Sequence, residues 1–178
     1  MSKTVVMMYS AIGHAYFHMF TAFYFVIVLS LEVEWRRPYH QLLDLWTLGA
    51  LLVGAFAIVA GWLGDRWSAR GMLVVFFLGM GLCSLAAGFA SSPFELLLAL
   101  SGLGLFAAIY HPVGIPLVIR NSGANQGKAL ALNGVFGSLG AAMAGAVTGV
   151  LADAGGSSLA FALPGAVVAL TGAAMGIG

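Results

Sequence analysis

The sequence predicts an all-α membrane protein in which six transmembrane helices form one bundle. Hydrophobic residues make up 61% of the 178 positions and charged residues only 7%, whereas a soluble globular domain carries roughly 25% charged residues. Short polar stretches also divide the chain into six apolar runs, and each run reaches the length of about 20 residues that crosses a bilayer. We therefore expect a single transmembrane domain over residues 1–178, with the lipid bilayer as its solvent.

The six expected helices follow one another with short connections. The first run, near 5–31, exceeds the short apolar region of a cleaved signal peptide, so we interpret it as a retained helix. The connections between runs are rich in charge or turn-forming residues, so consecutive helices should be antiparallel. The proline residues within two of the runs remove backbone donors and are expected to bend their helices; they are Pro112, Pro116 and Pro164. The expected helices lie near 5–31, 42–63, 71–90, 94–119, 128–152 and 158–178.

Basic residues predict the orientation of the bundle. Short cytoplasmic loops carry an excess of Lys and Arg, and five basic residues fall on one side of the expected bundle against two on the other. Both termini should therefore face the cytoplasm, and we expect a multi-pass protein of a bacterial inner membrane. The larger set is Lys3, Arg66, Arg70, Arg120 and Lys128, and the smaller set is Arg36 and Arg37.

Charge and residue patterns argue against two classes of function, nucleic-acid binding and enzymatic catalysis. The formal net charge is +1, and the basic residues are scattered, so no footprint for nucleic acid is present. No Ser/His/Asp, Cys/His or paired-carboxylate arrangement is visible, so we do not expect an enzyme. The single Cys83 supports neither an intrachain disulfide nor a thiolate metal site.

The connection after the second run carries the most specific motif of the chain. The stretch 61–70 reads Gly-Trp-Leu-Gly-Asp-Arg-Trp-Ser-Ala-Arg. It resembles the loop signature of the major facilitator superfamily, Gly-x-Leu-x-Asp-Arg-x-Gly-Arg-Arg/Lys, although Ser68 and Ala69 depart from it. The positions of this loop that match the signature are Gly61, Leu63, Asp65, Arg66 and Arg70. Residues 110–114 bear a weaker resemblance to fosmidomycin-resistance-like and uncharacterised members of the superfamily.

This resemblance implies a fold and a mechanism. The chain resembles the N-terminal half of the superfamily fold, one bundle of two inverted three-helix repeats, with substrate bound between two such bundles. It also implies that Gly61, Asp65, Arg66 and Arg70 form a conformational latch on the cytoplasmic side. A second bundle is then expected as a partner: a second copy, the missing C-terminal half or another membrane protein.

Other superfamily patterns are incomplete. Leu98 and Ser101 stand where an intramembrane Arg and its Gln would fall in the fourth run, and Val150 replaces the proline of the antiporter pattern in the fifth. Drug/proton antiport is therefore not supported by these motifs. Small residues do recur in the fifth run, and such residues let helices approach closely in lipid. We expect this packing role for Gly137, Gly145 and Gly149.

Polar residues within the spans are candidates for a cavity, because ionisable groups are costly there. His14 and His18 are four residues apart and share one helix face with Thr21. In the superfamily the first and fourth helices line the cavity, which implies that His14 and His111 lie at similar depth. The expected cavity residues are His14, His18, Thr21, Tyr110, His111 and Asn133.

Three interpretations of the histidines stay open. They can contact solute or exchange protons, since imidazole titrates near neutrality; they can be hydrogen-bonded packing residues; or they can ligate a metal or a tetrapyrrole. The last is the weakest, because no carboxylate or Cys accompanies them, so we expect no resident metal or cofactor.

The expected function is a secondary transporter, or half of one, that moves a small solute by alternating access. The alternative is a non-transporting structural or assembly subunit of a larger membrane complex.

Overall fold

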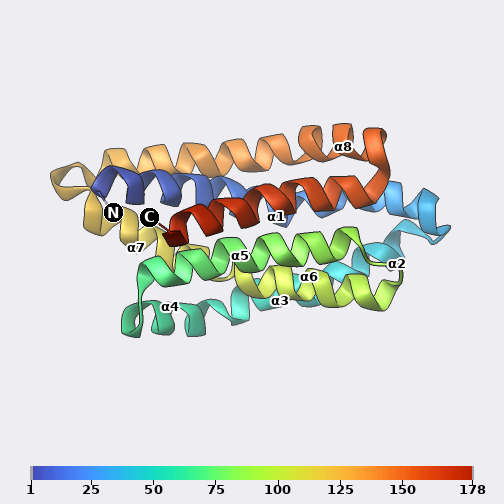
Figure 1. Ribbon diagram of the computed structural model, residues 1–178, viewed down its shortest axis with the longest axis horizontal. Helices are drawn as coiled ribbons and strands as arrows, with labels where there is room; N and C mark the ends of the chain where they lie inside the picture. The colour runs from blue at the N-terminus through green and yellow to red at the C-terminus, as the bar shows by residue number, and fades with distance from the viewer. Residues whose placement is uncertain (1, 178) are drawn as a thin grey trace.

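The computed structural model describes residues 2–177, which form helices joined by short turns and contain no strand (Figure 1). The all-α class predicted from composition is confirmed. The helices are α1 (Lys3–Trp35), α2 (Tyr39–Leu43), η1 (Asp44–Trp46), α3 (Thr47–Ala55), α4 (Ala57–Arg66), α5 (Ala69–Gly88), α6 (Pro93–Ala107), α7 (Tyr110–Asn121), η2 (Gly123–Asn125) and α8 (Gln126–Ile177).

Four helical segments are long and apolar enough to cross a membrane, or five if the bent pair 39–55 and 57–66 counts as one span. The predicted number is six. The difference arises at α8, which includes both of the last two expected runs. Its backbone leaves helical geometry only at Gly155 and Gly156, and the ribbon reverses direction there (Figure 1). The number of spans therefore stays a prediction.

The reversal of α8 is held by the end of α1. Gly156 has φ 71°, a left-handed conformation that glycine adopts readily. The Glu34 carboxylate accepts hydrogen bonds from the backbone N–H of Ser157 at 2.8 Å and from its hydroxyl at 2.5 Å. The Ser30 hydroxyl donates to the same carboxylate at 2.9 Å. Glu34 therefore caps the second arm of α8, residues 157–177, at its first free backbone donor.

Serine residues start two of the other helices. The Ser68 hydroxyl accepts from the backbone N–H of Gly71 at 3.0 Å, which begins α5. The Ser92 hydroxyl accepts from the N–H of Glu95 at 3.3 Å, and Pro93 occupies the first helical position of α6. Both arrangements satisfy backbone donors that have no partner within their helix.

The fourth expected helix is interrupted beside Pro112. Helix α6 ends at Ala107 and α7 begins at Tyr110, because Pro112 has no N–H to offer the carbonyl of Ala108. Ala108 and Ile109 keep right-handed helical dihedral angles, so the interruption is one of hydrogen bonding, and the bend expected at this proline stays a prediction. Helices α7 and α8 are uninterrupted at Pro116 and Pro164, in keeping with the tolerance of proline where neighbouring helices surround the freed carbonyl.

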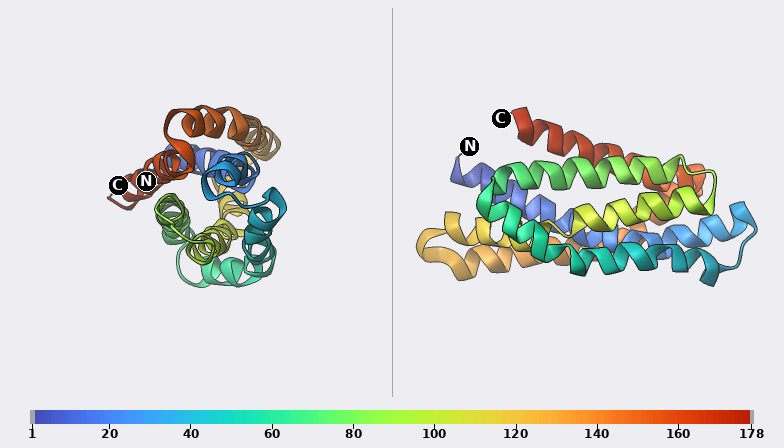
Figure 2. Two further views of the ribbon diagram at one scale, coloured as in Figure 1. Left: turned by 90° about the vertical axis from the view of Figure 1, so that its right-hand side faces the viewer. Right: turned by 90° about the horizontal axis from the view of Figure 1, so that it is seen from below.

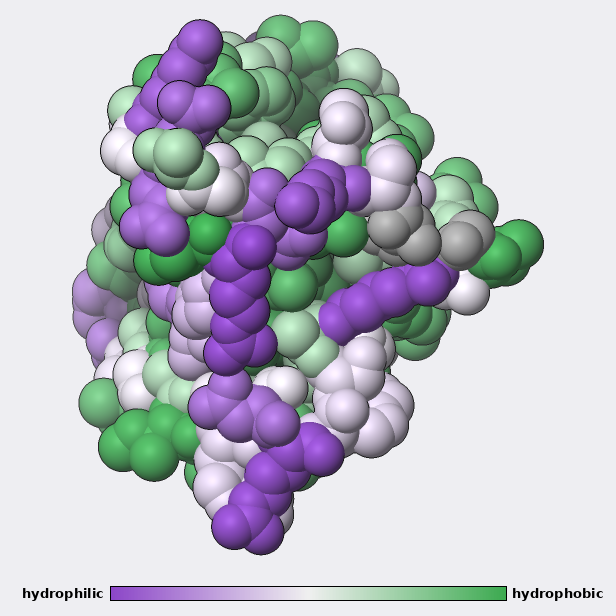
Figure 3. All heavy atoms as spheres, turned by 90° about the vertical axis from the view of Figure 1, so that its left-hand side faces the viewer, coloured by the Kyte–Doolittle hydropathy of each residue, from purple (hydrophilic) through white to green (hydrophobic). Residues whose placement is uncertain are grey.

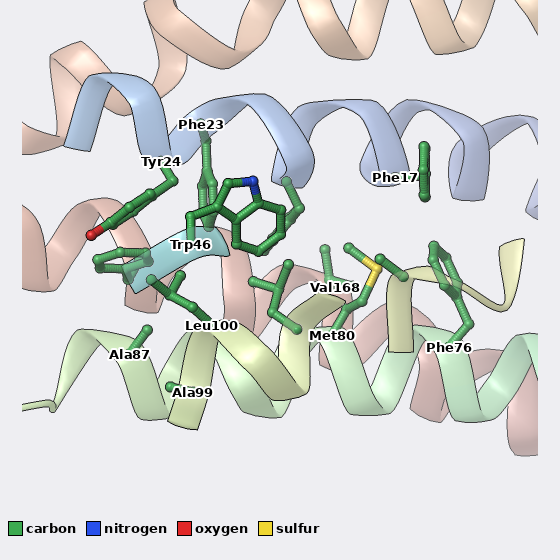
Figure 4. Packing of buried hydrophobic residues seen from close by; sticks show 14 of the residues in the cluster. Phe17, Phe23, Tyr24, Trp46, Phe76, Met80, Ala87, Ala99, Leu100 and Val168 are labelled. Carbon is green, nitrogen blue, oxygen red and sulfur yellow. The ribbon is translucent and has the colours of Figure 1, made fainter. Parts of the chain in front are cut away.

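The helices run alongside one another around a single core (Figure 2). Gly140 of α8 packs against the backbone carbonyl of Ala15 in α1, and Gly104 of α6 packs against the backbone of Gly49 in α3. Such contacts bring helices together where no hydrophobic effect is available to do so. The core residues labelled in Figure 4 are Phe17, Phe23, Tyr24, Trp46, Phe76, Met80, Ala87, Ala99, Leu100 and Val168.

Hydrophilic side chains gather at one end of the bundle (Figure 3). The N- and C-terminal ends of the ribbon, the α4–α5 turn and the α7–α8 connection all lie at this end (Figure 1). It is the end at which we expect the cytoplasm, and that orientation stays a prediction.

Candidate functional site

Helices α1, α7 and α8 bring five polar residues together inside a largely apolar bundle. Tyr110 is fully buried, Asn133 is 4% exposed and His14 is 8% exposed. His18 and His111 are half-buried beside them. The structure thus joins five of the six residues that we expected to line a cavity, although they come from three helices and are separated by up to 119 positions.

His14 is fixed by the backbone of α8. Its Nδ1 lies 2.8 Å from the backbone oxygen of Asn133 and 3.1 Å from the side-chain nitrogen of the same residue. One ring nitrogen cannot both donate and accept, and the shorter contact to a carbonyl requires a proton on Nδ1. We therefore assign the proton to Nδ1, which leaves a lone pair on Nε2.

His18 completes a chain of imidazoles along α1. Its Nε2 lies 3.1 Å from Nε2 of His14. Since His14 Nε2 carries the lone pair, His18 Nε2–H is the donor. The order of donation is then His18 to His14 and His14 to the backbone oxygen of Asn133. This chain links one turn of α1 to α8.

Tyr110 supports His14 from α7. The two rings stack with centroids 5.0 Å apart and planes 18° apart. The Tyr110 hydroxyl lies 2.7 Å from the backbone oxygen of Ser10 and 3.0 Å from Oδ1 of Asn133, and donates toward both. The buried Ser10 hydroxyl has no hydrogen-bond partner among the described residues.

His111 approaches the other two imidazoles from α7. Its ring meets that of Phe17 edge-on at 4.3 Å, and its centroid is 5.4 Å from that of His14 and 5.7 Å from that of His18. Nitrogen atoms of the three histidines all lie within 4.8 Å of one another. We call these three residues, His14, His18 and His111, the histidine triad.

Gly137 provides the space for the His14 ring. A Cβ atom at this position would lie 2.8 Å from Cε1 and 2.9 Å from both ring nitrogens. We expected Gly137 to pack against a helix backbone, and in the structure it packs against an imidazole. At Gly145 a Cβ would meet only Val26 at 3.6 Å, and at Gly149 it would meet nothing. The packing role of these two glycines stays a prediction.

Thr21 does not join the cluster. Its hydroxyl donates to the backbone oxygens of Phe17 and His18 at 3.0 and 3.2 Å, so it is occupied within its own helix. Phe17 is the contact residue that the sequence analysis missed, because a phenylalanine in an apolar helix carries no distinguishing signal. The role of Gly137 could have been found, since it lies one turn after Asn133 on the same face of α8.

The expected latch residues lie at the hydrophilic end of the bundle. Gly61 allows α4 to approach α7, where a Cβ would lie 3.2 Å from Pro112. The Arg66 guanidinium lies 4.8 Å from the ring centre of Trp62, and Arg70 Nη2 donates to the backbone oxygen of Met175 at 2.8 Å. Each basic residue thus has a contact within the bundle.

Asp65 pairs with Arg120 across the α4–α7 interface. Arg120 Nη2 lies 3.2 Å from Asp65 Oδ1, with side chains 60% and 73% exposed. The family resemblance implied a cytoplasmic latch that includes Asp65, and the basic residue that pairs with Asp65 in the structure belongs to the same chain. In the sequence, Arg120 served only to predict the orientation of the bundle. Its contact with Asp65 could not be predicted, because the distance between them depends on how α7 packs against α4.

We predict that Arg120→Ala lowers the free energy of unfolding by less than about 1 kcal/mol, because exposed ion pairs contribute little. Denaturation in mixed micelles measures this difference, and the remaining effect should vanish at high salt. Ser122→Ala is a control in the same segment, since it removes a side chain without changing charge. A loss of several kcal/mol would show that the pair has a structural role.

A sequence model of the Major Facilitator Superfamily matches residues 8–177. The chain belongs to the major facilitator superfamily. The resemblance predicted from the loop at 61–70 is thereby confirmed, and the narrower likeness at 110–114 stays a prediction. Members of this superfamily are transporters, and the long apolar helices agree with an integral membrane protein.

One relative of this major facilitator chain is the puromycin resistance protein pur8 of Streptomyces alboniger. The two are 31% identical over 112 residues, which cover 61% of this chain and 22% of the relative. The match therefore spans about a fifth of the relative's length.

Proposed function

We propose that the chain is one bundle of a secondary transporter that moves a small solute by alternating access, with the histidine triad, Tyr110 and Asn133 lining the solute path. The observation that carries this proposal is the linked polar cluster inside an apolar bundle of a transporter family. Polar and ionisable groups in a span are costly, so a concentration of them marks a solute or ion path.

The six-span topology is part of this proposal. The two arms of α8, residues 126–154 and 157–177, are each about 20 residues or longer, enough for one span apiece. With α1, the run from α2 to α4, α5 and the run from α6 to α7, they make six. We propose that both termini face the cytoplasm.

A second bundle is also proposed. His18 and His111 are half-buried in this chain, so part of the polar cluster is uncovered, and lipid cannot satisfy polar groups. The mass of the protein under native detergent conditions tests this. A mass above that of the 18.4 kDa chain, after subtraction of detergent, supports a dimer or a complex, and a monomer contradicts the homodimer.

Puromycin is the first solute to test, because a relative is named for resistance to it. We predict saturable uptake of labelled puromycin into proteoliposomes that contain the protein. His18→Ala and Asp65→Asn should each lower this uptake at least about tenfold, a transition-state difference of about 1.4 kcal/mol. His40→Ala is the matched control, since His40 is exposed outside the cluster and its loss should leave uptake unchanged.

Two results would contradict parts of the proposal. Uptake of other solutes but not of puromycin would contradict puromycin as the substrate and would still support a transporter. Flux that neither substitution alters, or the absence of any flux while the protein co-purifies with a larger assembly, would favour the structural-subunit alternative.

A further inference from the structure

The histidine triad has the chemistry of a metal site. Three imidazoles and no carboxylate make up the group, and imidazole nitrogen suits borderline divalent cations rather than Mg²⁺ or Ca²⁺. From the sequence we expected no metal, because no carboxylate or Cys accompanies the histidines. The structure places a nitrogen of His111, from α7, close to nitrogens of His14 and His18. We propose that the triad binds one borderline divalent transition-metal cation, such as Zn²⁺ or Co²⁺.

The distances in the triad are close to those that a metal requires. Zn–N bonds of about 2.0–2.1 Å in a tetrahedron place ligand nitrogens about 3.3 Å apart. Nε2 of His14 and Nε2 of His18 are already 3.1 Å apart. One nitrogen from each of the three histidines lies within 4.8 Å of the other two, so His111 must move closer to complete the site.

His14 is oriented as a metal ligand. A ligating imidazole almost always donates its other N–H to a carbonyl or carboxylate, which fixes the tautomer. His14 Nδ1 makes that bond to the backbone oxygen of Asn133 at 2.8 Å. The stacked Tyr110 ring and the missing side chain at Gly137 hold the plane of the ring. The lone pair of Nε2 thus points toward His18 before any ion is bound.

Binding requires a change of tautomer at His18 and no change in its number of protons. With the tautomers assigned above, His18 Nε2–H donates to His14 in the metal-free form. A cation takes both Nε2 lone pairs, so the His18 proton moves to Nδ1 through solvent, which the half-buried ring allows. Three protein ligands would leave the fourth tetrahedral position open to water or to an external anion, and because the three imidazoles are neutral the ion would keep its full charge.

Titration of the detergent-purified protein, prepared without a histidine tag, tests the site. We expect one Zn²⁺ per chain by calorimetry, the intense visible absorption of four-coordinate Co²⁺, and no binding of Mg²⁺. His18→Ala and His111→Ala should each lower the Zn²⁺ affinity by more than about tenfold, since even the loss of an outer partner costs that much. His40→Ala is the control, because this fourth histidine is exposed and lies outside the triad.

X-ray absorption spectroscopy at the zinc K edge tests the proposal on the wild-type protein, without any variant. About three imidazole neighbours around the bound Zn²⁺ support it, and one or none overturns it. It is also overturned if the wild-type protein binds no Zn²⁺, if both triad variants bind as the wild type does, or if His40→Ala abolishes binding. These measurements require no flux, so they fail or succeed independently of the transporter proposal.

Discussion

Replacing Gly137 with alanine is expected to destabilise the bundle by about 1–3 kcal/mol, the usual cost of overpacking a filled interior. The new Cβ would lie within 2.9 Å of three atoms of the His14 ring. The ring cannot retreat freely, because Tyr110 stacks against it and its Nδ1 bonds to α8. The substitution must therefore move the imidazole or separate α1 from α8. Denaturation in mixed micelles measures the loss.

Two alanine substitutions on the same helix provide matched controls. At Gly145 the added Cβ makes only an ordinary contact of 3.6 Å, and at Gly149 it meets open space. Alanine is a better helix former than glycine by up to about 1 kcal/mol, so these variants should be unchanged or more stable. If Gly137→Ala behaves as they do, the close fit of the imidazole against α8 is wrong. The same variant should also bind Zn²⁺ more weakly if the triad is a metal site.

Replacing Glu34 with alanine should lower the free energy of unfolding by about 2–4 kcal/mol. The carboxylate accepts three hydrogen bonds, two of them from Ser157, and a bond to a charged group contributes about 1.5–3 kcal/mol. The three contributions are not independent, so the expected total is below their sum. The second arm of α8 would lose its cap while Gly156 still holds a left-handed conformation.

Asp153→Ala is the control for Glu34. It removes the same charge near the same reversal, and the Asp153 side chain is exposed and has no hydrogen-bond partner among the described residues. We expect a change below about 0.5 kcal/mol, as for most surface substitutions. Glu34→Gln should fall between the two, because it keeps one acceptor oxygen. Equal effects of Glu34→Ala and Asp153→Ala would show that charge, and not the cap, matters there.

The fold class and the family could be predicted from the sequence because their signals are local. Apolar length and the loop at 61–70 each depend on consecutive residues, and so does the pairing of His14 with His18 on one helix face. The break beside Pro112 follows from a missing donor in a single residue. None of these requires knowledge of how one helix is rotated against another.

The rest of the site depends on packing between helices. Whether His111 meets His14 is determined by the rotation of α7, and whether Asn133 offers its backbone or its side chain is determined by how closely α8 approaches α1. The reversal of α8 was predicted as a five-residue connection at 153–157 because those residues are small or polar. It takes only two non-helical residues, because Gly156 can adopt a positive φ.

The break at Ala108–Ile109 separates α7 from α6 just before the triad. His111 lies in the first turn of α7 and Arg120 in its last, about 14 Å apart along the axis at 1.5 Å per residue. Helix α7 thus contributes His111 to the triad at one end and Arg120 to the ion pair with Asp65 at the other. A change in the tilt of α7 would act on both contacts, so we expect a cation bound at the proposed site to alter the strength of the Asp65–Arg120 pair.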